Sequence, residues 1–166
     1  HERGELILPH RFIPAAEHYF LLNAIDRWVV QNAMVEIAAQ PRDGIIHAIN
    51  LSGQSISDPN FLRFVFKAIE SSRVDPAVIC FEIAENVAVT RLTEVARLMQ
   101  SLRAIGVHFA IDHFGSGMAS FSYIKNLPVD FLKIEGSLVR AMLDSRMDRS
   151  LVDAIYRVGR DMGVTI

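Results

Sequence analysis

The stretch Ala110–Gly136 reads AIDHFGSGMASFSYIKNLPVDFLKIEG, and it places two short apolar strands on either side of a compact segment. The first strand ends in Asp112 with His113 directly behind it, and the second carries Lys133 at its carboxyl end. Charged groups are costly in buried strands unless that end of the strand faces a polar site. The stretch therefore predicts two strands whose carboxyl ends open onto a functional site.

The same pattern occurs twice earlier in the chain. The apolar run Ile45–Leu51 rises into Asn50, and the run Ala77–Ile83 carries Glu82 near its end, with Glu85 shortly beyond. Segments with apolar residues at helical spacing separate these runs. The polar strand ends follow one another about 20 to 30 residues apart, which is the length of one strand-plus-helix unit.

Regular alternation of apolar strands and helices predicts a parallel sheet covered by helices, an α/β fold. One polar group at the carboxyl end of each successive strand favours a TIM-type (β/α)8 barrel, present here as a partial barrel of about five strands. Val164–Ile166 begins the last of these strands. The alternative is a doubly wound open sheet, although no G-x-G-x-x-G phosphate loop follows the first strand. The expected helices cover residues 21–39, 61–71, 92–105, 119–126 and 150–162.

Composition narrows the class of protein. Hydrophobic residues make up 51% of the 166, which excludes a disordered chain, and no linker divides the sequence, so we expect a single domain over residues 1–166. A net charge of −2 gives no general attraction to DNA or RNA polymers. The single cysteine, Cys80, excludes disulfides. Because no apolar run approaches the ~18 residues of a membrane span, we expect a cytoplasmic domain, with a membrane anchor elsewhere in a longer parent left open.

The strand ends suggest metal-assisted chemistry. Asn50, Glu82 and Asp112 offer hard oxygen ligands, and His113 offers a nitrogen. Such donors at one edge suit Mg²⁺ or Mn²⁺, and two ions about 3.5–4 Å apart suit phosphodiester cleavage. Lys133 is placed to hold a water or a phosphate oxygen as a point charge.

Each of these residues also has a structural explanation. Asn50 is of a type that caps turns, and Asp112 precedes a turn-forming glycine. Glu82 could pair with an arginine across the sheet. Their occurrence on consecutive strand ends favours a common site over separate structural roles.

A series of short motifs spans the chain in a fixed order. They read FIPAAE at 12–17, DRWV at 26–29, INLS at 49–52, FEIAE at 81–85, DHFGSG at 112–117, LPVD at 127–130 and LKI at 132–134. The set resembles the EAL domain family, which cleaves the bacterial second messenger cyclic di-GMP and whose patterns include F-I-P-x-A-E, E-I-T-E, D-D-F-G-T-G and L-P-V-D-x-L-K-I-D. The resemblance implies a phosphodiesterase that hydrolyses cyclic di-GMP to linear pGpG with two Mg²⁺ or Mn²⁺ ions.

Carried over by position, the resemblance makes Asn50, Glu82 and Asp112 metal ligands, with His113 at a further ligand position. It gives Lys133 and Glu82 catalytic roles, with Lys133 as the lysine that holds the attacking water.

The resemblance also concerns the loop that follows Asp112. Glu85 matches the glutamate that anchors this loop, which in the family is tied to metal occupancy and dimerisation. A homodimer is therefore expected, and a diguanylate-cyclase-type or sensory domain in the same parent chain is left open.

Departures from the family pattern keep a second function open. His113 stands where the family has a second aspartate, and imidazole suits Mg²⁺ poorly and brings no negative charge to bridge two ions. Ala84 replaces a threonine, and Glu135 replaces an aspartate. The alternative is a degenerate, catalytically inactive domain that acts as a cyclic di-GMP receptor or as a protein-interaction module.

The family pattern also reaches outside this sequence. It places the E-A-L tripeptide before His1 and a catalytic glutamate after Ile166. We therefore expect a partial EAL domain that does not hydrolyse its substrate by itself.

Overall fold

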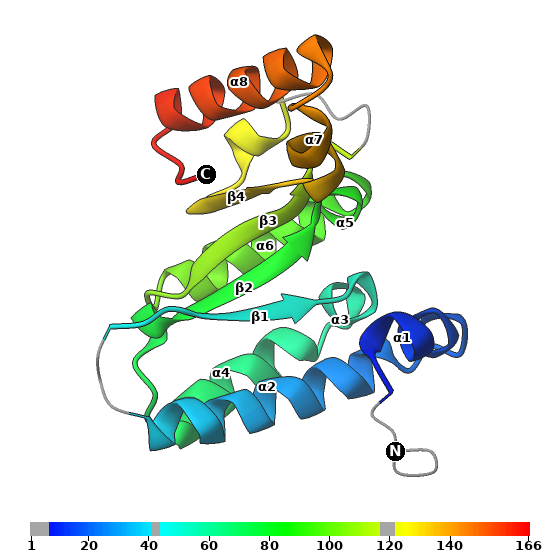
Figure 1. Cartoon of the computed structure of the whole chain (residues 1–166). Helices are drawn as coiled ribbons and strands as arrows, with labels where there is room; N and C mark the ends of the chain where they lie inside the picture. The colour runs from blue at the N-terminus through cyan, green and yellow to red at the C-terminus, as the bar shows by residue number, and fades with distance from the viewer. Residues whose placement is uncertain (1–6, 41–43, 117–121) are drawn as a thin grey trace.

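A computed structural model describes residues 7–40, 44–116 and 122–166 as an α/β structure with one parallel sheet (Figure 1). The sheet has four strands in the order β1-β2-β3-β4 among the described residues. The strands are β1 (His47–Leu51), β2 (Ile79–Ala84), β3 (His108–Phe114) and β4 (Phe131–Ile134). The helices are α1 (Pro9–His18), α2 (Leu22–Ala39), α3 (Gly53–Ser57), α4 (Phe61–Ser72), α5 (Glu85–Thr90), α6 (Leu92–Arg103), α7 (Gly136–Ala141) and α8 (Arg146–Asp161), with 3-10 turns η1 (Pro76–Val78) and η2 (Ile124–Asn126).

The strand order favours a barrel over a doubly wound sheet. Each strand pairs in parallel with the next one along the chain, so the order shows no reversal of the kind that marks a doubly wound fold. The chain then returns beside β4: Phe131 and Thr165 form a parallel bridge, and the Thr165 carbonyl accepts a hydrogen bond from the Leu132 N–H at 2.8 Å. This bridge lies where the fifth strand is expected, and the partial TIM-type fold is confirmed.

Three features of the elements differ from the sequence expectations. The strand at β3 continues two residues beyond Asp112: its register with β4 shifts after Ile111, and Phe114 then pairs with Ile134 and is 2% exposed. The short helices α3, α5 and α7 directly follow strands and were not expected, since five or six residues carry too little periodicity to be recognised. The helix expected over 119–126 lies partly outside the described residues, and its described end forms η2.

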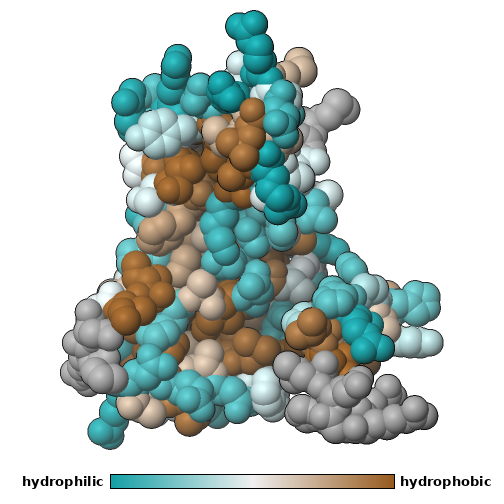
Figure 2. Space-filling view, viewed as in Figure 1, coloured by the Kyte–Doolittle hydropathy of each residue, from teal (hydrophilic) through white to brown (hydrophobic). Residues whose placement is uncertain are grey.

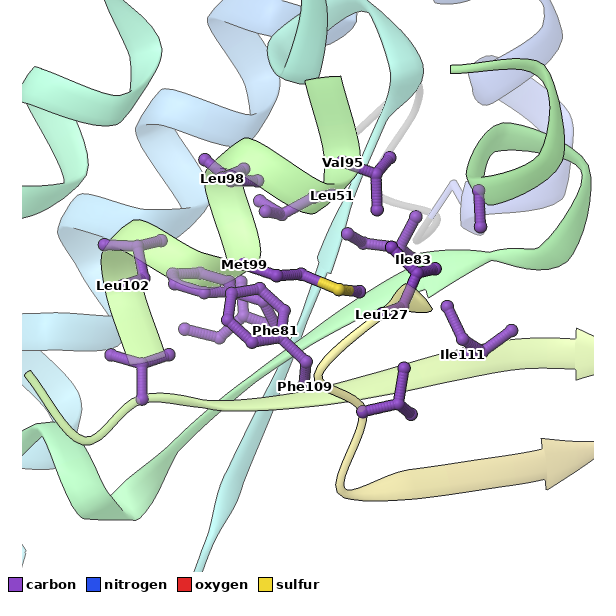
Figure 3. Packing of buried hydrophobic residues seen from close by; sticks show 14 of the residues in the cluster. Leu51, Phe81, Ile83, Val95, Leu98, Met99, Leu102, Phe109, Ile111 and Leu127 are labelled. Atoms are coloured by element: carbon purple, nitrogen blue, oxygen red, sulfur yellow. The ribbon is translucent and has the colours of Figure 1, made fainter. Parts of the chain in front are cut away.

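Alternation along the strands gives the sheet two different faces. Side chains on one face, such as Phe81 and Phe109, are fully buried under helices (Figure 3). They share one cluster with Val30 of α2, Val65 of α4 and Met99 of α6. Successive residues of a strand point to opposite faces, so the residues between these core positions lie on the helix-free face.

The outer surface carries scattered apolar residues. Figure 2 shows apolar areas among polar ones, including some in the region of α7 and α8. The exposed large apolar residues there include Val139, Leu143, Met147 and Leu151. Within the three described segments, no helix combines the length and apolar character that crossing a bilayer requires.

Candidate functional site

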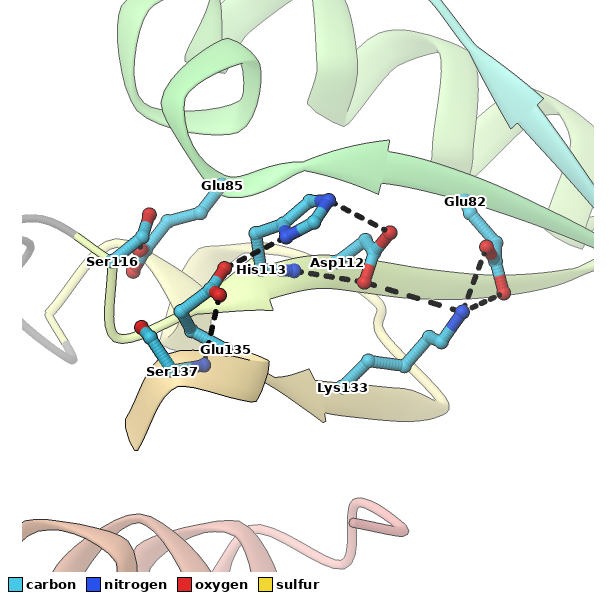
Figure 4. A network of polar contacts seen from close by, with 8 residues as sticks. All are labelled: Glu82, Glu85, Asp112, His113, Ser116, Lys133, Glu135 and Ser137. Atoms are coloured by element: carbon cyan, nitrogen blue, oxygen red, sulfur yellow. Dashed lines mark hydrogen bonds and ion pairs between the residues drawn. The ribbon is translucent and has the colours of Figure 1, made fainter. Parts of the chain in front are cut away.

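The strand register brings the predicted site residues to one face at the carboxyl edge of the sheet. Asn50 of β1 lies opposite Glu82 of β2, and Glu82 lies opposite Ala110 of β3. Asp112 follows Ala110 by two residues and therefore points to the same face. Lys133 of β4 reaches across to this group from the neighbouring strand (Figure 4).

The centre of the site is an ion pair between Lys133 and Glu82. The Lys133 Nζ donates to both carboxylate oxygens of Glu82, at 2.9 and 3.0 Å, and lies 4.0 Å from the Asp112 Oδ1. Glu82 is 6% exposed, so this contact satisfies a buried charge, while the lysine remains about half exposed. The hydrogen bond to Glu82 raises the pKa of Lys133 above its ordinary value. The lysine is therefore a permanently charged group held between two carboxylates.

His113 lies beside this pair on a distorted end of β3. Its backbone has φ of +57°, in the left-handed region that few side chains adopt, and its ring is largely exposed. The ring Nδ1 lies 2.7 Å from the Glu135 Oε2, and the Nε2 lies 3.5 Å from the Asp112 Oδ2. The imidazole thus bridges the carboxylates of β3 and of the segment after β4.

Glu135 also belongs to this network, although in the sequence it stood out only as a departure from the family pattern. Its Oε1 accepts from the Ser137 N–H at 3.1 Å. That backbone hydrogen bond, and next the His113 ring, hold the pKa of Glu135 below its ordinary value. Its position two residues after Lys133 was the signal that it belongs to the same edge.

Glu85 lies apart from these residues and contacts the loop after β3. It is 2% exposed; its Oε2 accepts from the Gly115 N–H at 3.1 Å, and its Oε1 accepts from the Tyr123 hydroxyl at 3.3 Å. Burial, followed by the Glu85 charge, raises the pKa of Tyr123. The role of Tyr123 could not be predicted from the sequence, because its contact with Glu85 joins segments 38 residues apart. Glu85 therefore contacts this loop on both sides of residues 117–121, which the structure does not describe: at Gly115 before them and at Tyr123 after them.

The donor set can be tested for its fit to a divalent cation. Glu82 and Asp112 present carboxylate oxygens at this edge (Figure 4), and Asn50, which lies opposite Glu82 in the strand register, adds a side-chain amide; hard cations such as Mg²⁺ prefer such oxygen donors. The Lys133 ammonium already lies between the two carboxylates, so this position accepts positive charge. Among residues 7–40, 44–116 and 122–166, no three or more His, Cys, Asp or Glu side chains lie close enough together to hold a metal ion by themselves. The chemistry of the donors fits a cation at an open edge.

The site is an open edge and not an enclosed pocket. A cavity of about 440 Å³ lies at the opposite end of β1, lined in part by His47, Arg73 and Asp75. It contains none of the predicted site residues. This cavity and the predicted site therefore lie at different ends of the sheet.

Comparisons with known proteins agree with this geometry. The sequence is 33% identical over 163 residues to the cyclic di-GMP phosphodiesterase PdeB of Shewanella oneidensis, covering 97% of this chain and 19% of that protein. The structure superposes on the PaMucR phosphodiesterase in its c-di-GMP complex with a TM-score of 0.91 at 28% identity, covering 99% of this chain and 68% of that one. The FimX EAL domain of Pseudomonas aeruginosa bound to c-di-GMP gives 0.89 at 28% identity, covering 98% and 66%.

The chain spans between 19% and 26% of the length of the first curated relatives that it matches. The family match itself covers the whole sequence: the family model described as EAL domain aligns with residues 1–166. The chain belongs to the EAL domain family.

Proposed function

We propose that this chain forms the central part of a phosphodiesterase that hydrolyses cyclic di-GMP to linear pGpG. The observation that carries the proposal is the Lys133–Glu82 ion pair beside Asp112 at the carboxyl edge of a parallel sheet. Relatives that are 33% and 32% identical to this chain are named cyclic di-GMP phosphodiesterases, which supports the same substrate.

Lys133 and Glu82 are the proposed catalytic pair. Lys133 keeps its charge across the physiological range, so its Nζ can orient a water or a phosphate oxygen. Glu82 holds the Nζ with two hydrogen bonds and so limits where that charge can lie.

The proposed ligands for divalent metal are Asn50, Glu82 and Asp112, with His113 as a further donor. Bound Mg²⁺ or Mn²⁺ would supply the positive charge that offsets charge building up on the phosphate during cleavage. This chain would contribute the oxygen donors at one edge of the sheet. The register of β1 with β2 places two of them, Asn50 and Glu82, opposite each other.

The direct test is to incubate the full-length protein with cyclic di-GMP and Mg²⁺ or Mn²⁺ and to follow pGpG by chromatography. We expect metal-dependent product, and a loss of about 100-fold or more for Lys133→Met, comparable to the removal of one preorganised charge stabiliser. Lys125→Met, on η2, is the matched control and should keep wild-type rates. Tight nucleotide binding without any product would contradict the enzyme and support the receptor.

The receptor alternative rests on His113. Its ring contacts Asp112 and Glu135 where the family pattern has an aspartate, so the site lacks one carboxylate. We expect His113→Asp to raise the Mg²⁺-dependent rate, because it adds a negative oxygen donor. Glu135→Gln is the control, since it removes the negative charge beside the ring without adding an oxygen donor at the position of His113. An unchanged rate in His113→Asp would show that this side chain does not act at the metal site.

We also propose that the parent chain carries further domains and works in the cytoplasm. We propose in addition that it forms a homodimer through the loop after Asp112. The support is that Glu85 ties both described ends of that loop to the domain. Sedimentation of wild type and Glu85→Ala tests this: the variant should shift toward monomer, and an unchanged dimer would contradict the role of the loop.

A further inference from the structure

A second buried carboxylate, Asp26 of α2, contacts the turn that follows β1. It is 8% exposed, and its Oδ2 accepts three hydrogen bonds. The donors are the Ser52 N–H at 2.8 Å, the Ser52 hydroxyl at 2.6 Å and the Ser55 hydroxyl at 2.6 Å. Hydrogen bonds to a carboxylate are about twice as strong as neutral ones, so this is a firm attachment between a helix and a turn.

The turn is also organised locally. Ser52 is the N-cap of α3, and its hydroxyl oxygen accepts from the Ser55 N–H at 3.3 Å. Gln54 attaches the same short helix to the start of α2, since its Oε1 accepts from the Leu22 N–H at 3.1 Å. Asp26 and Gln54 together fix α3 against α2.

The turn begins two residues after a proposed metal ligand. Sheet pairing holds β1 as far as Leu51, which lies opposite Ile83, and Asp26 takes the next backbone N–H, that of Ser52. Asn50 is exposed, so the direction of its amide depends on the backbone on either side of it. The backbone is held by β2 before the turn and by Asp26 after it.

We propose that Asp26 is a positioning residue for Asn50. Asp26 fixes the Ser52 N–H by accepting its hydrogen bond. The last residues of β1 therefore keep one direction, and the Asn50 amide points to the site edge. The expected change in Mn²⁺-dependent activity rests on the proposed function. The positioning of Asn50 does not, because it is a property of the unliganded chain.

The variant that tests this is Asp26→Asn, which keeps the shape of the side chain and removes its charge. Arg27→Met is the matched control, because Arg27 lies on the same turn of α2 but pairs at 2.7 Å with Asp58, the C-cap of α3, and makes no hydrogen bond to Ser52 at its N-cap. Both variants should lower stability, so stability alone does not distinguish them.

The first measurement is NMR on the unliganded full-length protein. Asp26→Asn should shift the Ser52 amide signal and speed its hydrogen exchange at least tenfold, and it should shift or broaden the Asn50 side-chain amide pair. Arg27→Met should leave both groups unchanged. If the Ser52 signal moves and the Asn50 signal does not, the positioning role is wrong.

The second measurement is the activity as a function of Mn²⁺. Asp26→Asn should raise the half-saturating Mn²⁺ concentration about tenfold, as the loss of a group that orients a ligand does, with the KM for cyclic di-GMP changing less than about twofold. A wild type without activity would contradict the proposed function, while the NMR result would still decide the role of Asp26.

Discussion

Two loops at the carboxyl edge of the sheet are each tied down by a buried carboxylate, but in different ways. Asp26 of α2 holds the turn after β1 through Ser52 and Ser55, which are three residues apart. Glu85, the first residue of α5, holds the loop after β3 through Gly115 and Tyr123, which lie at its two described ends. The first attachment is compact, and the second spans a loop.

The difference shows which loop is easier to change. The turn after β1 has its own hydrogen bonds within α3, so Asp26 adds to an arrangement that is already defined locally. At the described ends of the loop after β3, Gly115, Ser116 and Tyr123 all donate hydrogen bonds to one distant carboxylate, that of Glu85. We therefore expect loss of Glu85 to release a whole segment, and loss of Asp26 to misdirect a short one.

The largest effect is expected from Glu85→Ala. It removes the acceptor of the buried Tyr123 hydroxyl and of the half-buried Gly115 N–H, which should cost about 3 kcal/mol of stability, measured by urea unfolding. Hydrogen exchange should accelerate at Gly115 and not at Ser52, with the reverse in Asp26→Ala. Acceleration at both sites in either variant would show that the two attachments are not separate.

A medium effect is expected from glycine replacements in the two loops. Gly115 has φ of +93°, and a Cβ there would lie 2.7 Å from the Leu138 Cδ1, whereas a Cβ on Gly53 would meet the Arg91 Nε at 3.2 Å, with no positive φ. Gly115→Ala should cost about 2 kcal/mol, from left-handed backbone plus a displaced rotamer. Gly53→Ala should stay within about 0.5 kcal/mol of wild type.

Adding Leu138→Ala to Gly115→Ala separates the two causes. The double variant should remove the part of the cost that comes from the displaced leucine and leave the backbone part. Equal costs for Gly115→Ala and Gly53→Ala would show that the loop after β3 is not more constrained than the turn after β1.

The smallest effect is expected from Tyr123→Phe and concerns pH. Loss of the hydroxyl donor should cost about 1 kcal/mol at pH 8. Because burial raises the folded pKa of Tyr123 above the unfolded value of 10.0, its contribution is complete below pH 10 and is lost as the pH rises further. The difference between wild type and Tyr123→Phe in urea unfolding should therefore shrink from pH 10 upward. A difference that stays constant to pH 11 would contradict the raised pKa of Tyr123 in the folded state.

The strands and the edge that carries the site could be predicted because polar residues interrupt apolar runs at Asn50, Glu82, Asp112 and Lys133. A local pattern of this kind is visible in one sequence. The Asp26 and Glu85 attachments join residues 26 to 38 positions apart, so no local pattern reveals them. The positive φ of His113 was equally hidden, because it occurs within the register shift between Ile111 and Phe114, which depends on the pairing of β3 with β4.

The register of β1 and β2 has a consequence for how this chain can evolve. Ile49 lies opposite Phe81 in the core, and one residue later Asn50 lies opposite Glu82 at the site. Inserting or deleting a single residue in either strand would exchange the two faces of that strand, turning its polar residue toward the core and its apolar residue toward the site. Length changes inside the strands therefore destroy fold and site together, and variation in length must accumulate in the connections between strands and helices.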